Sequence, residues 1–155
     1  MRKIILHVED DENDVLLIHH ALKKAGILDP IQVATDGQMA IDYFEGAGKF
    51  ADRSEFPLPT LVLLDLKLPH VPGLEVIKWI RREAGLSVPL VVLTSSEHEG
   101  DIAAAYELGA NAYLVKPTDS RKLAEMAQAI NLFWFIHNQP PVHAAQRSTY
   151  THQPG

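Results

Sequence analysis

The sequence of 155 residues contains no cysteine. Disulfide bonds, thiolate zinc sites, iron–sulfur clusters and thiol nucleophiles are therefore excluded, and the chain suits a reducing compartment such as the cytoplasm. Positively charged residues are also fewer than negatively charged ones. The chain has 14 Lys and Arg residues and 20 Asp and Glu residues, which give a formal net charge of −6. This balance argues against general binding to nucleic acid and against attraction to an anionic membrane surface.

Long apolar segments are missing as well. No stretch approaches the roughly 20 consecutive apolar residues of a membrane-spanning helix, and the N-terminal MRKIILHVEDD has too few apolar residues for a signal peptide. With 46% hydrophobic and 22% charged residues, the composition is nevertheless close to that of an average globular protein. We therefore expect one cytoplasmic domain over residues 1–138, with neither nucleic acid nor membrane as a partner.

Short apolar runs alternate with longer segments of helical period. The runs are continuous, which predicts strands buried on both faces of a parallel sheet; they are Ile4–Val8, Ile31–Ala34, Leu61–Leu64, Leu90–Leu93 and Ala112–Val115. Between them, apolar residues recur every three or four positions, for example at Val15, Ile18, Leu22 and Ala25, at Leu74, Ile77 and Ile80, and at Leu123, Met126, Ile130 and Phe133. This order predicts an α/β fold in which five helices cover a doubly wound sheet of five parallel strands.

Two segments fall outside this pattern. Residues 45–59 are rich in Gly and Pro and predict a long loop at the sheet end opposite the βα loops. Residues 139–155 have no periodicity and predict a C-terminal tail rather than an output domain. We therefore expect any output to pass through contacts of the domain with another protein.

Reactive side chains follow four of the predicted strands, at the edge where the βα loops lie. They are Glu9, Asp10 and Asp11 after the first strand, Asp65 after the third, Thr94 after the fourth and Lys116 after the fifth. Carboxylates on neighbouring strands repel one another, so such a group needs a cation to stay ionised, and hard oxygen ligands favour Mg²⁺ or Mn²⁺ over zinc. A lysine and a hydroxyl at the same edge are suitable donors to a phosphate oxygen.

The segments that carry these residues resemble the four motifs of the response-regulator receiver domain of two-component signalling. They read IILHVEDDENDVLLI, LVLLDLKLPHVPGLEVI, PLVVLTSS and LGANAYLVKP, in the order that this family shows, over about residues 3–137. The resemblance implies a flavodoxin-like fold with strand order 2-1-3-4-5. It also implies a phosphoacceptor that takes a phosphoryl group from a histidine kinase and switches a protein-interaction surface, rather than an enzyme with a separate substrate.

The resemblance gives two of the motifs a role in phosphorylation and metal binding. Asp65 matches the phosphoacceptor, and Glu9 and Asp10 match the acidic pair that binds Mg²⁺ together with Asp65. The backbone carbonyl of Lys67 matches a further metal ligand. The side chain of Lys67 departs from the family pattern, since receivers often have an uncharged polar residue there, and its ammonium would sit near the phosphoryl group.

The other two motifs match the residues that hold and sense the phosphoryl group. Thr94 matches the hydroxyl that binds it, and Lys116 matches the ion-pairing lysine that precedes a cis proline, here Pro117. Tyr113 matches the aromatic residue that rotates when Thr94 moves toward the phosphoryl group. These matches imply that phosphorylation is coupled to the surface of the fourth helix, fifth strand and fifth helix.

Some of these assignments have alternatives. Asp10 and Asp11 could form the metal pair, although Asp11 is also a suitable N-cap for the helix that follows it. Thr94 suits an ordinary cap of the next helix, and Tyr113 suits a core aromatic.

Three histidines in the first strand and first helix also need an assignment. His7 is expected to be packed and neutral inside the first strand. His19 and His20 are expected to be structural rather than part of a phosphorelay, because adjacent helix residues point in different directions.

The segment Ala129–Ile136 (AINLFWFI) is apolar nearly all round, which exceeds what one buried helix face needs, so a partner should cover part of it. Its FW pair, together with the long loop before the third strand, resembles single-domain receivers that serve phytochrome kinases. This resemblance implies a phytochrome-type histidine kinase as partner. It also implies a homodimer through Ala129–Ile136 and the fourth helix, fifth strand and fifth helix, whereas the downstream protein is not identified by the sequence.

Other functions compete with a working receiver. A phosphorylation-independent pseudo-receiver module would lack the acceptor or the lysine, and this chain has both Asp65 and Lys116. A flavodoxin-type cofactor protein would need a Gly-, Ser- or Thr-rich phosphate loop after the first strand. A haloacid-dehalogenase-type phosphatase would need a second Asp where this chain has Lys67.

Overall fold

All five apolar runs form parallel strands in the computed structural model, which describes residues 3–137. The elements are β1 (Ile5–Val8), α1 (Glu12–Lys24), β2 (Ile31–Ala34), α2 (Gly37–Glu45), the 3₁₀ turn η1 (Gly48–Phe50), β3 (Leu61–Leu64), α3 (Gly73–Lys78), the π-helical turn η2 (Trp79–Glu83), β4 (Leu90–Thr94), α4 (Glu99–Leu108), β5 (Ala112–Val115) and α5 (Ser120–His137). The strand order is β2-β1-β3-β4-β5, with every neighbouring pair parallel. The predicted doubly wound fold is therefore confirmed.

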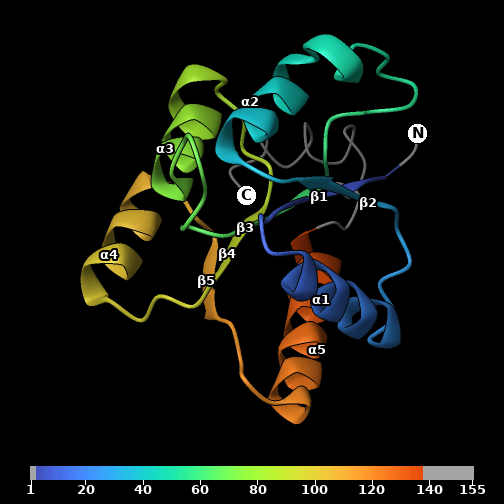
Figure 1. Cartoon of the computed structure of the whole chain (residues 1–155), viewed down its shortest axis with the longest axis vertical. Coiled ribbons are helices and arrows are strands. Elements are labelled where there is room, and N and C mark those ends of the chain that lie inside the picture. Colours follow the sequence, from blue (N-terminus) through green and yellow to red (C-terminus); the bar gives the residue numbers. More distant parts are fainter. Residues whose placement is uncertain (1–2, 138–155) are drawn as a thin grey trace, which may run out of the picture.

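Helices cover both faces of the sheet (Figure 1). α1 and α5 lie together on one face, and α2, α3 and α4 lie on the other. Because successive side chains of a strand point to opposite faces, Ile5 of β1 packs with Ile18 and Ile130, whereas Leu6 packs with Ala40 and Val76. The inner strands β1, β3 and β4 are thus buried on both faces, which is why their sequences are almost entirely apolar, whereas the edge strands β2 and β5 are only partly buried.

The boundaries of the elements differ slightly from the predicted ones. β1 begins at Ile5 instead of Ile4, and β4 extends by one residue to Thr94. α1 ends at Lys24, and Gly26 follows shortly after it with a left-handed φ of 102°. The third helical segment is α-helical only to Lys78 and then widens into η2.

The predicted loop of residues 45–59 is more ordered than its Gly and Pro content suggests. It contains η1, and the ring of Phe50 is buried between Tyr43 and Phe56, with ring centroids 4.9 and 5.3 Å apart. Arg53 donates hydrogen bonds to three carbonyl oxygens, of Tyr43, Phe44 and Phe56. Three aromatic rings and a guanidinium therefore give this loop a small core of its own.

The C-terminal part of α5 is partly covered by the domain itself. Ile130 and Trp134 are buried, whereas the side chain of Leu132 is 63% exposed. Between residues 3 and 137, no helix is both long enough and apolar enough to cross a membrane. The predicted tail of residues 139–155, and its boundary at residue 138, lie outside the described residues and stay predictions.

Candidate functional site

The carboxyl ends of β1, β3 and β5 bring three charged side chains together. Glu9 follows β1, Asp65 follows β3 and Lys116 follows β5, so the parallel arrangement places all three at one edge of the sheet. The Lys116 Nζ donates to Glu9 Oε1 at 2.5 Å and to Asp65 Oδ2 at 2.8 Å. Residues separated by up to 107 positions in the sequence thus meet in one ion-paired cluster.

Asp65 is held by groups from three different elements. Its Oδ1 accepts a hydrogen bond from Thr94 Oγ1 at 2.7 Å and from the Lys67 N–H at 3.2 Å, and its Oδ2 accepts one from Lys116. Thr94 is the last residue of β4 and is fully buried, whereas 6% of Asp65 remains exposed. Thr94 makes no side-chain cap to α4, whose N-cap is His98. Its hydroxyl is therefore directed at Asp65 and not at the next helix.

Three carboxylates form a group that suits a divalent cation. One oxygen from each of Glu9, Asp10 and Asp65 lies within 4.8 Å of the others, the group that the sequence singled out. Asp11 is turned away, because its carboxylate accepts hydrogen bonds from the N–H groups of Asn13 and Asp14 and caps α1. The geometry thus favours Glu9 and Asp10 over Asp10 and Asp11 as the acidic pair. Hard carboxylate oxygens with room for water suit Mg²⁺ or Mn²⁺.

Burial and ion pairing shift the pKa values of the charged groups in this site in opposite directions. Burial raises the pKa of Glu9 to about 7, although the Lys116 hydrogen bond opposes that shift. Burial would also raise the pKa of Asp65, but hydrogen bonds from Lys116, Thr94 and the Lys67 N–H outweigh it and hold this pKa below its usual range. Burial would lower the pKa of Lys116, yet its hydrogen bonds to Asp14, Asp65 and Glu9 together raise it. Asp65 is thus kept ionised, while Glu9 holds a proton readily when no cation is present.

The remaining predicted residues lie beside this cluster, with two differences from expectation. The Lys116–Pro117 peptide bond is trans, so the expected cis bond is wrong; trans is the isomer that an X–Pro bond favours without a constraint on it. Tyr113 is partly buried, and its hydroxyl donates to the Ser96 carbonyl at 2.9 Å. Its side chain therefore packs against the core and also contacts the loop after β4, which follows Thr94.

Two contacts of the site were missed by sequence reasoning. Asp14 of α1 accepts a hydrogen bond from Lys116 Nζ at 2.8 Å. Ser96, which is buried, donates to Asp101 of α4 at 2.6 Å and so fixes the loop that Tyr113 contacts. An acid in the first turn of a helix normally indicates only a favourable interaction with the helix dipole, so no sequence signal separates Asp14 from such acids.

The histidines behave as structural residues. His7 is buried, and its Nδ1 lies 3.0 Å from His19 Nε2, so one hydrogen bond joins β1 to α1. Burial lowers the pKa of His7 to about 3, which confirms a packed neutral imidazole. His20, the next residue of α1, is exposed.

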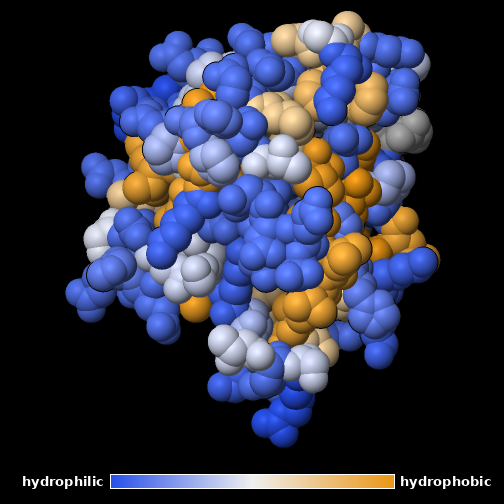
Figure 2. Space-filling view, viewed as in Figure 1, coloured by the Kyte–Doolittle hydropathy of each residue, from blue (hydrophilic) through white to orange (hydrophobic). Residues whose placement is uncertain are grey.

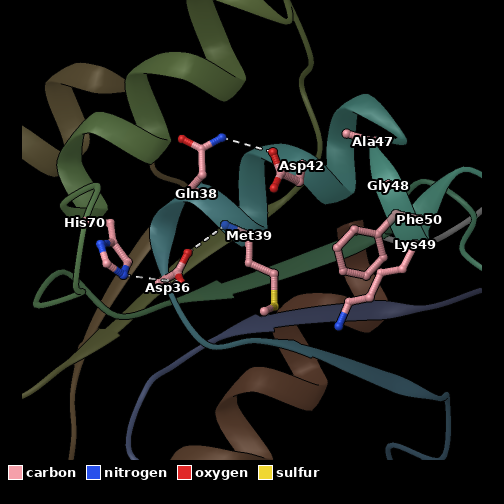
Figure 3. A pocket seen from close by; sticks show the side chains of 9 residues that line it. All are labelled: Asp36, Gln38, Met39, Asp42, Ala47, Gly48, Lys49, Phe50 and His70. Atoms are coloured by element: carbon pink, nitrogen blue, oxygen red, sulfur yellow. Dashed lines mark hydrogen bonds and ion pairs between the residues drawn. The ribbon is translucent and has the colours of Figure 1, made fainter.

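A separate pocket lies along α2, away from the acidic group (Figure 3). Asp36 and His70 face each other at one end of it, with 3.9 Å between His70 Nε2 and Asp36 Oδ2. The residues that line the pocket are Asp36, Gln38, Met39, Asp42, Ala47, Gly48, Lys49, Phe50 and His70. Acidic and basic groups are mixed there, so the pocket has no single charge that would select a ligand.

Comparison with known proteins agrees with this geometry. The family model of the response regulator receiver domain matches residues 5–128. Response regulator Rcp1 of Synechocystis sp. is 38% identical over 133 residues, which are 85% of this chain and 88% of Rcp1.

Solved structures of response regulators share the fold. The phosphorylated cyanobacterial phytochrome response regulator RcpA superposes with a TM-score of 0.78 at 34% identity, covering 87% of this chain and 95% of that chain. The Mn²⁺-bound form of Rcp1 superposes with a TM-score of 0.77 at 36% identity, covering 92% and 99% respectively. Because the sequence match extends over most of the chain and the fold agrees with it, the chain belongs to the receiver-domain family of response regulators, the phosphoacceptor modules of two-component signalling.

Proposed function

We propose that Asp65 is the phosphoacceptor of this receiver domain. The observation that carries the proposal is the set of groups around its carboxylate. Asp65 is nearly buried, ionised by its hydrogen bonds, and placed between the Lys116 ammonium, the Thr94 hydroxyl and a pair of further carboxylates. This arrangement supplies a nucleophile together with donors for the oxygens of an incoming phosphoryl group.

The reaction is transfer of a phosphoryl group from a kinase phosphohistidine to Asp65. A carboxylate oxygen of Asp65 forms a bond to phosphorus, the phosphorus–nitrogen bond breaks, and the imidazole of the kinase leaves with that electron pair. Lys116 and Thr94 donate hydrogen bonds to the phosphoryl oxygens and hold them in line. Hydrolysis of the acyl phosphate by water, helped by the same residues, resets the domain.

Mg²⁺ is the cofactor that fits the acidic group. Glu9, Asp10 and Asp65 would hold it, with the backbone carbonyl of Lys67 as a further ligand, and Mn²⁺ would fit the same oxygen ligands. The bound cation supplies positive charge that neutralises the phosphoryl oxygens. The carboxylates of Glu9 and Asp10 would otherwise repel a dianionic donor, so the cation also makes the approach of the donor electrostatically favourable.

The experiment that tests this function is the intact mass of the chain after incubation with acetyl phosphate. We expect a gain of one phosphoryl group that requires Mg²⁺, is absent in Asp65→Asn, and is retained in Asp42→Asn, which removes a carboxylate outside the site. A magnesium-independent gain, or a gain that survives Asp65→Asn, would contradict the assignment. No gain from acetyl phosphate or from any phosphorylated histidine kinase would favour the pseudo-receiver module.

A phytochrome-type histidine kinase is the partner that the relatives suggest, because RcpA, which shares the fold at 34% identity, is a cyanobacterial phytochrome response regulator. A kinase that transfers a phosphoryl group to Asp65 has to contact the protein surface around the site. Figure 2 shows hydrophobic atoms over α1 in the lower right of the view. In this helix Leu16 and Leu17 are 69% and 57% exposed. Leu16 also lines a hollow beside Glu9 and Asp10. Apolar surface at the rim of a polar site suits a protein partner.

A second copy of the chain is the proposed partner for the face of α4, β5 and α5. Each of these elements exposes an apolar side chain, Tyr106, Val115 and Leu132, at 47%, 38% and 63%. Size-exclusion chromatography with light scattering should give the mass of a dimer for the wild type and of a monomer for Val115→Glu. A monomeric wild type at high micromolar concentration would rule out this part of the proposal.

A further inference from the structure

We propose that Asp14 is a positioning residue of the phosphorylation site, whose carboxylate anchors the Lys116 ammonium while the ammonium changes partner from Asp65 to the phosphoryl group. This inference rests on the proposed function of Asp65. It goes beyond the residues to which the motifs give a role, because Asp14, although it lies in the first motif segment, is on α1 and belongs to none of the strand ends that form the site.

The hydrogen bonds of Lys116 account for all of its donors. A lysine ammonium has three N–H groups, and here they have three carboxylate acceptors: Glu9 Oε1 at 2.5 Å, Asp14 Oδ2 at 2.8 Å and Asp65 Oδ2 at 2.8 Å. The side chain of Lys116 is only 13% exposed, so water has limited access to replace any of them. Asp14 thus provides one third of the ammonium's hydrogen bonds.

The ordinary explanation for an acid at position 14 does not account for this contact. Asp14 is the third residue of α1 after the N-cap Asp11, where an acid typically accepts a hydrogen bond from the N–H of the cap residue. In this chain the Asp11 N–H donates to Glu9 Oε2 instead, at 3.2 Å. The carboxylate of Asp14 is directed at Lys116, whereas Glu12, the other acid of the first turn, is exposed and has no contact with that lysine.

The position of Asp14 is fixed by contacts on both sides of it along α1. Its N–H donates to the Asp11 carboxylate at 3.1 Å, which locks the first turn of the helix. Farther along the helix, His19 pairs with the buried His7 of β1 and ties α1 to the sheet. These contacts fix the helix backbone that carries Asp14, so its side chain, which is 35% exposed, reaches Lys116 from a defined position.

Anchoring by Asp14 keeps the ammonium fully bonded before and after phosphoryl transfer. When Asp65 becomes an acyl phosphate, its oxygens lose their negative charge and are poor acceptors, and one N–H of Lys116 passes to a phosphoryl oxygen. The remaining two N–H groups can stay on Glu9 and Asp14. Without Asp14, one of them would be left to water or to Asp65, and the ammonium would be less firmly directed at the phosphoryl group.

The first test follows the ammonium of Lys116 in the unphosphorylated, metal-free chain by ¹⁵N NMR of the lysine ammonium groups, with Lys116→Arg to assign the signal. We expect the exchange of its protons with water to be at least about tenfold faster in Asp14→Asn than in the wild type, as for loss of one charge-assisted hydrogen bond. Glu12→Gln removes the same charge from the same helix turn and should leave the exchange unchanged. Equal exchange in Asp14→Asn and the wild type would overturn the anchoring.

The second test measures the rate of phosphorylation by acetyl phosphate at saturating Mg²⁺. Asp14→Asn should slow it by about tenfold, Asp14→Glu should recover part of the loss, and Glu12→Gln should keep the wild-type rate. In a Lys116→Ala background, Asp14→Asn should cause no further loss, because the residue acts through the lysine. A wild type that gains no phosphoryl group from acetyl phosphate or from a phosphorylated histidine kinase would overturn the proposed function itself, whereas equal rates in the wild type and Asp14→Asn would overturn only the role of Asp14.

Discussion

The buried side chain of His7 makes the stability of the domain depend on pH. Its pKa is about 3 in the folded chain, from an ordinary value of 6.5, with burial as the main cause. Between these values the unfolded chain binds a proton that the folded chain does not, so the free energy of unfolding falls as the pH drops from 6.5 toward 3. The loss over that window is on the order of 4 kcal/mol. Down to pH 4.5 the loss is about 2.7 kcal/mol. We expect His7→Leu to remove most of this loss, as measured by urea unfolding from pH 7.5 to pH 4.5.

The control for this prediction is His20→Gln, which replaces an exposed histidine on the same helix that contacts His7. It should retain the wild-type dependence on pH. Curves for the wild type and His7→Leu that stay parallel over the whole range would contradict the prediction. The comparison is made between variants because Glu9, whose pKa is raised, acts in the opposite direction between pH 4.5 and 7.

Gly73 connects the loop after Asp65 to α3 through a close approach of backbone atoms. A Cβ atom at this position would lie 2.4 Å from the Asp65 carbonyl oxygen and 2.5 Å from Leu66 Cα. Gly73→Ala should therefore lower the free energy of unfolding by about 2 kcal/mol and slow the phosphorylation of Asp65, because the loop has to shift. Gly100→Ala, where no atom lies within 4 Å, should instead stabilise α4 by about 0.5–1 kcal/mol. Similar unfolding midpoints for the two variants would contradict this account.

At the scale of single residues, the sequence predicts the strand-end residues well and the contacts between elements poorly. Glu9, Asp65, Thr94 and Lys116 were predictable because each directly follows a recognisable apolar run. Asp14 was not, since its contact depends on where α1 lies relative to β5, which local pattern does not specify. Their assignment as acceptor, metal ligands and phosphoryl-binding groups stays a proposal until the phosphorylation experiment is done.

Among the secondary-structure elements, the strands follow most directly from sequence. Their apolar runs are short and bounded by polar residues, and the three inner strands are buried on both faces. Three of the five strands have the predicted bounds, and the other two differ by one residue. The segment of residues 45–59 was harder to predict, because its order comes from Phe50 and Arg53 packing against α2, over distances that a turn pattern does not encode. Gly and Pro indicate where a helix or strand ends, but they do not exclude a local core.

Arg53 holds the end of α2 and gives a prediction for that element. Its guanidinium donates to the carbonyl oxygens of Tyr43 and Phe44 in the last turn of α2 and to that of Phe56 in the loop. The last carbonyl groups of a helix have no partner within the helix, and water would otherwise bind them. Arg53→Ala should cost about 2 kcal/mol of the free energy of unfolding. Arg82→Ala removes an exposed arginine and should change it by less than about 0.5 kcal/mol. Equal effects of the two substitutions in urea unfolding would show that the loop is held by its rings alone.

The charge of the site ties metal binding to the stability of the whole domain. Three carboxylates within 4.8 Å repel one another, and a bound cation relieves that repulsion only in the folded chain. At a Mg²⁺ concentration roughly 100 times its Kd, the domain should gain about 2.7 kcal/mol of stability. Scanning calorimetry should show this as a higher Tm in Mg²⁺ than in EDTA, and Asp10→Asn should remove most of the difference.

The same linkage predicts how metal binding depends on pH. Because the pKa of Glu9 is about 7 in the metal-free chain, Mg²⁺ has to displace a proton from it below that pH. The affinity for Mg²⁺ should therefore fall as the pH drops from 7.5 to 6, and titration calorimetry should detect a proton released to the buffer at pH 6.5. An affinity that does not change over this range would mean that Glu9 is not a ligand.

The sequence separation between Lys116 and its partners affects when the ion-paired cluster can form during synthesis of the protein. The lysine meets Asp65 across 51 positions, Asp14 across 102 and Glu9 across 107. A nascent chain that has emerged only as far as β4 therefore carries its carboxylates without the ammonium that balances them, and such long-range contacts form late in folding. Asp65 is then present before Lys116, the ammonium that pairs with it. Under the proposed function, the domain can therefore be phosphorylated efficiently only after the segment that follows β5 has been synthesised.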